Sequence, residues 1–263
     1  MGLFNRNYDK PGPGVQKDEP RKKGAARFFE LLIRDFWDMV KLNILLSICV
    51  LPSLVLFVLG FLGFYPGIAF ILCLLLSFPI GGALVAYIYN ITRMMRDDPS
   101  YVWYEFKRKF KENYLQAAPV GMLCSAFILA QILLWVSIIM NESGGELVWL
   151  LVALVSLVIF GMITPYIFLN FAYIELTTLK IIKNSILMSF GYLPRSFAGV
   201  LMGSIMWIVF ALFFPVSMTF FPLIALFGLS ISMLLTLMWV WPPFDNHFKI
   251  EETLIKRVEE ENE

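Results

Sequence analysis

Three long stretches without a charged side chain organise this sequence. They cover residues 42–92, 113–174 and 196–244, and the middle one is broken only by Glu142 and Glu146. One helix crosses the hydrocarbon core of a bilayer with about 20 residues, so each stretch is long enough for two crossings and a tight turn. The sequence therefore predicts an all-α membrane protein with six transmembrane helices arranged as three hairpins.

The composition agrees with lipid as the surrounding solvent. The chain is 59% hydrophobic and 16% charged, whereas a soluble domain carries about 25% charged residues. The net charge of +1 gives no indication of a nucleic-acid partner. The three cysteines (Cys49, Cys73 and Cys124) lie in apolar stretches without a CxxC pair. They are interpreted as small buried hydrophobic residues, and neither a disulfide framework nor a zinc site is indicated.

Proline and glycine mark the breaks within the predicted spans. Pro52 lies inside the first span, residues 63–67 form a short turn, and Pro79 is followed closely by Gly81 and Gly82. The two glycines would allow another helix to approach closely. The six predicted spans cover residues 42–62, 68–89, 115–140, 147–173, 197–214 and 222–241.

An amphipathic helix is predicted before each hairpin, over residues 24–41, 101–114 and 178–193. In the first, charged residues from Arg27 to Lys41 recur at spacings of three and four, which predicts a solvated stripe opposite an apolar face. Such a helix would lie at the membrane interface or pack on the cytoplasmic surface of the protein itself.

The remaining segments are polar and lie at the two ends. Residues 1–23 are rich in proline, glycine and charge, and are interpreted as a cytoplasmic tail that does not fold alone. Phe4 and Tyr8 leave open that this tail is a docking peptide. Residues 24–245 form the predicted membrane domain, and residues 246–263 a charged cytoplasmic tail.

The positions of the basic residues predict the orientation. With the N-terminus inside, the inner segments hold nine, six, three and three Lys or Arg in chain order, which accounts for all 21 in the sequence. Because Lys and Arg concentrate on the cytoplasmic side of membrane proteins, both termini are predicted to be cytoplasmic.

The spans offer few groups for chemistry. None of the six predicted spans contains an ionisable Asp, Glu, Lys, Arg or His, and the only histidine, His247, follows the last span. Buried ionisable residues usually mark ion-coupled or catalytic membrane proteins. The sequence therefore predicts no enzymatic activity and no cofactor or metal. The polar residues at depth predict hydrogen bonds between helices, or the lining of a path for a neutral solute. They are Gln131, Thr164, Asn170, Ser204, Ser217, Thr219, Ser230, Ser232 and Thr236.

Aromatic residues of the inner segments are the candidate contact residues. They would lie in the headgroup belt or contact a partner membrane protein. The candidate partner-binding residues are Phe4, Tyr8, Phe36, Trp37, Trp103, Tyr104, Phe106 and Phe110.

Several blocks of the sequence resemble the YesL-like family of bacterial integral membrane proteins of unknown function. The blocks are Phe-Phe-Glu-Leu at residues 28–31 with Lys-Leu-Asn at 41–43, Pro-Ile-Gly-Gly-Ala at 79–83, the aromatic and basic run 103–113, and residues 183–195. The family usually has Gly-Pro-Ala-like residues in the second span, and the C-terminal part of this chain matches loosely.

The resemblance implies an accessory or regulatory subunit beside a carbohydrate ABC transporter in the bacterial plasma membrane. Permease subunits of that transporter and the lipid bilayer are then the expected partners. The chain has no Walker motif and no Glu-Ala-Ala coupling loop, so it is expected to be neither the ATPase nor the permease. The alternative is a self-sufficient transporter or channel for a small neutral solute.

Overall fold

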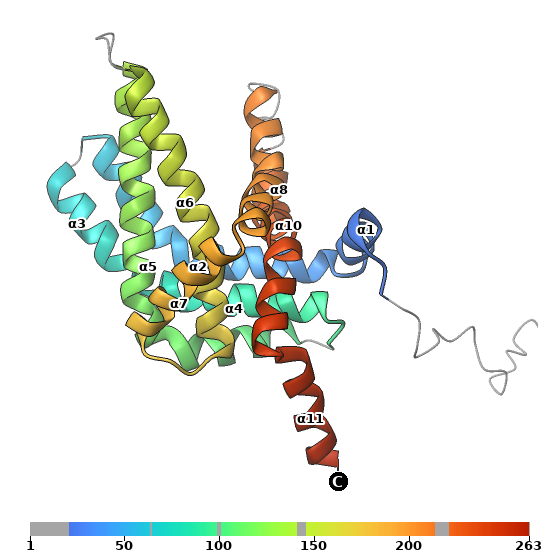
Figure 1. The fold of residues 1–263 in the computed structure, drawn as a ribbon. Coiled ribbons are helices and arrows are strands. Elements are labelled where there is room, and N and C mark those ends of the chain that lie inside the picture. The colour runs from blue at the N-terminus through green and yellow to red at the C-terminus, as the bar shows by residue number, and fades with distance from the viewer. Residues whose placement is uncertain (1–20, 64, 99–100, 141–145, 214–220, 263) are drawn as a thin grey trace, which may run out of the picture.

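The computed structural model describes residues 21–63, 65–98, 101–140, 146–213 and 221–262, and over these the protein is helical without a strand. The all-α prediction is confirmed. The helices are arranged as Figure 1 shows. Their bounds are α1 Gly24–Arg34, α2 Phe36–Phe61, α3 Pro66–Leu76, α4 Phe78–Met95, α5 Val102–Met140, α6 Glu146–Tyr173, α7 Thr178–Gly191, α8 Leu193–Leu212, α10 Phe221–Phe248 and α11 Ile250–Asn262.

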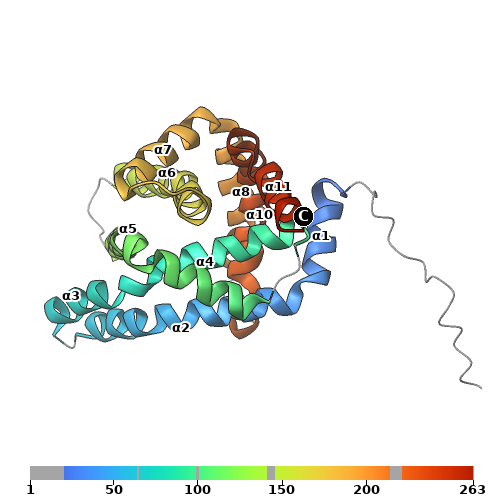
Figure 2. The same cartoon turned by 90° about the horizontal axis from the view of Figure 1, so that it is seen from below.

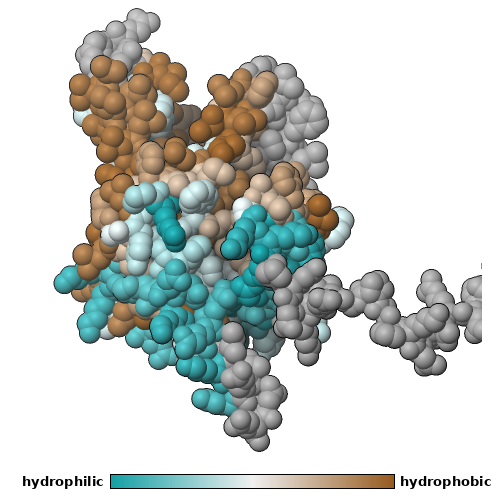
Figure 3. All heavy atoms as spheres, turned by 45° about the vertical axis from the view of Figure 1, so that its right-hand side comes forward, coloured by the Kyte–Doolittle hydropathy of each residue, from teal (hydrophilic) through white to brown (hydrophobic). Residues whose placement is uncertain are grey.

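Several of these helices are long and apolar enough to cross a membrane. Five helices have the required length and hydrophobicity on their own: α2, α5, α6, α8 and α10. A sixth crossing results if α3 and α4 form one bent span. Hydrophobic residues gather on the upper part of the face in Figure 3 and hydrophilic residues on its lower part. This division agrees with a multi-pass membrane protein whose charged end is the lower one.

The second predicted span, residues 68–89, is not one straight helix. α3 ends at Leu76, α4 begins at Phe78, and the two are bent by 40° at this break. Pro79 lies in the first turn of α4, where proline is favoured because it has no N–H to donate to the preceding turn. α3 exposes most of its side chains, whereas α4 is buried along most of its length. The predicted three-hairpin arrangement is therefore not confirmed.

α4 is the central helix of the lower part of the molecule. It contacts α2, α5, α6 and α10, and Figure 2 shows α2, α4 and the first part of α5 running across the lower end side by side. The crossing of α4 and α5 depends on small residues. A Cβ atom on Gly81 would lie 2.1 Å from the Ala117 carbonyl oxygen, and one on Gly121 would lie 2.3 Å from the Gly81 nitrogen. The predicted close approach at Gly81 and Gly82 is confirmed.

Two of the three predicted amphipathic helices are not separate elements before a span. The helix predicted over residues 24–41 is interrupted at Asp35, and its second half is the beginning of α2. The helix predicted over residues 101–114 continues into the third span as the 39-residue α5. Pro119 lies inside α5, and proline bends a helix because it removes one backbone hydrogen bond. Accordingly, the first part of α5 lies along α4 and the second part rises beside α6 (Figure 1).

The third predicted amphipathic helix is a separate element. It forms α7, which begins at Thr178 and ends at Gly191. α7 connects the lower end of α6 to the base of α8 (Figure 1).

Candidate functional site: an arginine cluster at the end of α4

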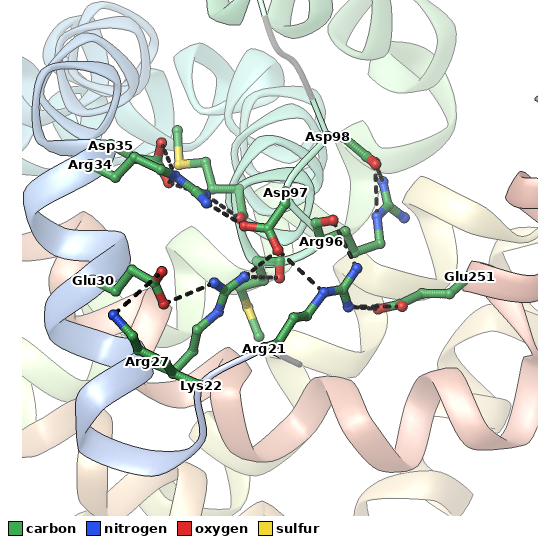
Figure 4. A network of polar contacts seen from close by, with 12 residues as sticks. Arg21, Lys22, Arg27, Glu30, Arg34, Asp35, Arg96, Asp97, Asp98 and Glu251 are labelled. Atoms are coloured by element: carbon green, nitrogen blue, oxygen red, sulfur yellow. Dashed lines mark hydrogen bonds and ion pairs between the residues drawn. The ribbon is translucent and has the colours of Figure 1, made fainter. Parts of the chain in front are cut away.

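The end of α4 is capped by arginines that come from the segment 21–34. The last carbonyl groups of a helix have no partner within the helix. Here three successive carbonyl oxygens each accept a hydrogen bond from a different arginine (Figure 4). The pairs are Arg34 with Met94 at 2.7 Å, Arg27 with Met95 at 2.9 Å, and Arg21 with Arg96 at 2.9 Å.

Asp97, the residue directly after these three carbonyl groups, contacts the same three arginines. Its carboxylate accepts hydrogen bonds from Arg27 at 2.6 Å and from Arg34, and it pairs with Arg21 at 3.2 Å. The backbone of Asp97 has a φ of 64°, a left-handed conformation that Asp and Asn tolerate better than most residues. The turn after α4 therefore points one carboxylate at three guanidinium groups.

These contacts perturb the ionisation of both partners. Burial alone would raise the pKa of Asp97, but the hydrogen bonds from Arg34 and Arg27 outweigh it and hold that pKa below its usual value. The pKa of Arg34 is raised by its hydrogen bond to Asp35 and, against the opposing effect of burial, by its bond to Asp97. At neutral pH the Asp97 carboxylate and the Arg34 guanidinium are therefore both ionised and attract each other.

The outer members of the cluster balance its charge. Glu30 pairs with Arg27 at 3.1 Å, Asp35 pairs with Arg34 at 2.7 Å, and Glu251 of α11 pairs with Arg21 at 3.0 Å. The basic members are Arg21, Lys22, Arg27, Arg34 and Arg96, and the acidic members are Glu30, Asp35, Asp97, Asp98 and Glu251, so five charges of each sign cancel. Because the cluster has no net charge, it has no excess positive charge to hold an anion. Its ion pairs connect separate elements of the fold.

Arg96 extends the arginine cluster to α6 and α10. Its side chain is only 4% exposed and pairs with Asp98 at 2.8 Å. Its guanidinium carbon lies 5.3 Å from the ring centre of Tyr173 and 5.5 Å from that of Trp241. Arg96 Nη1 has no hydrogen-bond partner within the described residues, and the two aromatic faces provide the cation–π attraction that compensates the buried charge. The indole N–H of Trp241 in turn donates to Glu251 at 3.3 Å.

The chemistry available to this cluster is structural. Arginine does not release its proton at physiological pH, and the pKa of Asp97, which faces three of the arginines, is lowered. His247 lies on an exposed part of α10, with its ring against Phe248. Among the residues that the structure describes, no group of His, Cys, Asp and Glu side chains is arranged to hold a metal ion. The arrangement connects α1, α4, α6, α10 and α11.

A second polar cluster, neutral and fully buried, joins α2, α4 and α10. The Tyr87 hydroxyl donates to Asn43 Oδ1 at 2.8 Å and lies 3.0 Å from Ser230 Oγ. Ser230 Oγ also lies 2.7 Å from Asn43 Oδ1 and 3.0 Å from the Met39 carbonyl oxygen. For Ser230 the predicted hydrogen bonding between helices is thus observed.

Other polar residues at depth also find partners on neighbouring helices. Gln131 donates to Ser156 at 2.7 Å, and Asn170 donates to Ser185 at 3.0 Å. Ser232 donates to the Gly203 carbonyl oxygen at 2.5 Å. These bonds tie α5 to α6, α6 to α7, and α8 to α10.

The predicted contact residues divide between surface and interior. Trp37, Trp103 and Tyr104 are exposed by 72%, 66% and 63%. Phe106 is buried and Phe110 is partly buried, and their rings stack at 6.4 Å. We therefore assign these two phenylalanines to the core instead of a contact surface.

Phe36 is likewise half-buried, with its ring 5.8 Å from that of Phe227. The remaining two candidates, Phe4 and Tyr8, lie outside the described residues.

The arginine cluster was not predicted from the sequence. The predicted solvated stripe contained Arg27 and Arg34, but Arg27 is buried against Asp97. The sequence did contain an indication of this cluster. Asp97 and Asp98 follow an apolar helix, and the C-terminal end of a helix favours nearby cations. Which arginines meet that turn depends on how the chain folds back before α2.

Comparison of the chain with protein-family models, with curated proteins and with solved structures finds no match. The resemblance to the YesL-like family stays a prediction from the sequence.

Proposed function

We propose that this protein is a non-enzymatic membrane subunit that binds a partner membrane complex through its inner surface. Following the sequence resemblance, the partner is a carbohydrate ABC transporter of the bacterial plasma membrane, which the subunit stabilises or regulates. The observation that carries the proposal is an exposed aromatic and basic face on the first part of α5. This docking face consists of Trp103, Tyr104, Lys107 and Lys111.

The composition of the docking face supports partner binding. Tryptophan and tyrosine are the residues that most often dominate the energetics of protein interfaces. Lys107 and Lys111 are exposed and have no ion pair within the described part of the chain, so they are available to acidic groups of a partner.

The docking face is mounted on a rigid support. Glu105, on the buried side of the same helix, pairs with Arg93 of α4 at 2.8 Å and with Arg108 at 2.5 Å. The close α4–α5 crossing fixes the helix further along. Rigid presentation reduces the entropy lost on binding.

The membrane orientation belongs to the same proposal. Three hairpins with six spans arise if α3 and α4 together count as the second span. Both termini are then on the same side of the membrane, and the positions of the basic residues make this the cytoplasmic side. In a variant without native cysteines, a cysteine at Glu146 should react with a membrane-impermeant maleimide in intact cells. A cysteine at Lys107 should react only after the cells are permeabilised. The opposite pattern would invert the orientation and remove the docking face from the cytoplasm.

Pulldown of the tagged protein in mild detergent, with mass spectrometry, tests the partner. Permease subunits of a sugar importer should be recovered with the wild type. Trp103→Ala combined with Tyr104→Ala should lower that recovery at least about tenfold, since two interface aromatics contribute about 2 kcal/mol or more. The matched control combines Trp149→Ala with Tyr65→Ala, exposed by 57% and 79% at the other end of the molecule. Equal recovery with both double variants would contradict the proposal.

A transporter or channel for a small neutral solute is the second candidate. The observation that favours it is that Asn90 Oδ1 on α4 and Ser189 Oγ on α7, two of four such buried polar atoms, have no hydrogen-bond partner in the described residues. Buried polar atoms without partners often contact water or a ligand. Flux of a neutral sugar into liposomes that contain the purified protein alone would replace the subunit proposal with this one.

A further inference from the structure

α7 presents an unusual outward face. Its inward side is buried in the core through Ile181, Ser185 and Met188. On the outward side Leu179, Leu187 and Phe190 are exposed by 80%, 62% and 48%. Exposing three such side chains to water is unfavourable by roughly 25 cal/mol for each Å² of apolar surface. The face therefore needs an apolar neighbour.

The same outward face carries positive charge, and the nearest acidic residue along the chain is Glu175, which lies before α7. Lys180 and Lys183 are exposed, and within the described residues they have no ion pair. The sequence contains no Asp or Glu between Glu175 and Asp245. The neighbour of α7 must therefore combine apolar surface with negative charge.

The position of α7 shows how these two needs are met along one helix. Both lysines lie in the first half of α7, and from Asn184 to its end at Gly191 the helix has no charged residue. The first half adjoins the lower, polar end of the molecule, since Thr178 donates to the Gln116 carbonyl oxygen at 3.3 Å. The second half rises to the base of the membrane-spanning α8 (Figure 1). Leu179 and the two lysines thus lie in the first half of the outward face, and the uncharged second half carries Leu187 and Phe190 toward α8.

We infer that the outward face of α7 is a binding surface for anionic phospholipid of the inner leaflet. Lys180 and Lys183 contact the phosphate headgroups, while Leu187 and Phe190, in the half of α7 nearer α8, lie against the acyl chains. Interfacial helices bind in this way through an apolar face and lysines that reach the headgroup level. A protein partner of α7 would need the same alternation of acid and apolar surface, whereas an anionic lipid supplies both in one molecule.

Native mass spectrometry of the full-length protein in detergent tests the inference. Phosphatidylglycerol and phosphatidylcholine with identical acyl chains are titrated separately, and the bound adducts are counted. Wild-type protein should bind phosphatidylglycerol more tightly. Each lysine near an anionic lipid surface accounts for about a fivefold gain. Lys180→Gln with Lys183→Gln should therefore weaken phosphatidylglycerol binding by about 30-fold and leave phosphatidylcholine binding unchanged.

The matched control removes two lysines elsewhere. Lys249→Gln with Lys256→Gln takes the same charge from α11 and the residue before it, where both lysines already pair with Glu252. This control should retain the phosphatidylglycerol preference. Equal losses in both double variants, or no lipid preference in the wild type, would overturn the inference. All four substituted side chains are exposed, and an unchanged melting temperature of each variant verifies that folding is intact.

Discussion

Replacing Asp97 by Asn tests whether the arginine cluster is what holds α1 to the rest of the protein. Asn also tolerates the left-handed backbone conformation observed at this position, so the substitution removes the charge without straining the turn. α1 buries only Arg27 and Leu31. Its attachment therefore combines the arginine bonds with the packing of Leu31 and of the partly buried Phe28 and Leu32.

The expected loss can be worked out from the exposure of each pair. The Arg27 side chain is 10% exposed, and a hydrogen bond to a charged group in such a place contributes about 1.5 kcal/mol. The Arg34 and Arg21 side chains are 40% and 49% exposed, and such pairs contribute about 0.5 kcal/mol each. The substituted asparagine would still accept one neutral hydrogen bond, and the three carbonyl bonds would remain. The net loss is about 2 kcal/mol, or about a 30-fold increase in the opening equilibrium of α1.

Hydrogen–deuterium exchange of the α1 amides measures this opening directly. Exchange in α1 should accelerate about 30-fold in the Asp97→Asn protein, while exchange in α6 should not change. Asp38→Asn is the control, because it removes the same charge from α2, where Asp38 forms one exposed pair with Lys41. If α1 exchanged at the wild-type rate in Asp97→Asn, the cluster would not be the attachment of α1, and the reasoning would fail.

The pH dependence of the same measurement follows from the lowered pKa of Asp97. Its pKa is lower in the folded state than in the unfolded state. The ionised carboxylate therefore stabilises the attachment fully above the ordinary Asp pKa of about 4, and this contribution is lost as the pH falls through the folded-state pKa. After correction for intrinsic exchange, the difference between wild type and Asp97→Asn should be constant from pH 7 to pH 5 and shrink below about pH 4.

Three further substitutions test the packing. Gly81→Ala places a methyl group against the Ala117 carbonyl oxygen and should cost about 3 kcal/mol or more, measured as a lower melting temperature in detergent; Gly67→Ala, with open space around its Cβ, should be neutral. Tyr87→Phe removes two buried hydrogen bonds and should cost about 1–2 kcal/mol; an unchanged melting temperature would mean that water replaces the hydroxyl. Phe106→Ala should lower stability by about 3–5 kcal/mol because its ring lies in the core, and a stable variant that loses only partner recovery would return Phe106 to the contact surface.

The membrane character of the fold was accessible from the sequence because hydrocarbon imposes a strict requirement. A chain in lipid must satisfy its backbone within each segment, so long apolar stretches become helices. The prediction gave the outer ends of α2, α5, α6 and α8 closely. It missed the break at Ser77, because the apolar run 68–89 looks the same whether the helix is straight or bent.

The candidate sites were less accessible, since exposure depends on neighbours. Trp103 and Phe106 both lie on the first part of α5, three residues apart, and both are aromatic. One is exposed and the other buried, because α4 covers only one side of that helix. The amphipathic pattern predicted a helix with one apolar and one polar face, but not which face would pack against α4.

By itself, the sequence determined that the chain is helical, that it prefers lipid, and that its basic residues gather at one end. These properties follow from local composition, since burial of apolar surface and the cost of charge in hydrocarbon act on each segment separately. The tertiary structure alone decided that α4 lies buried at the centre and that Arg21, Arg27 and Arg34 converge on Asp97. Those partners are about 60–75 residues apart along the chain, and only the packing of α1 beside the end of α4 brings their charges within reach of one another.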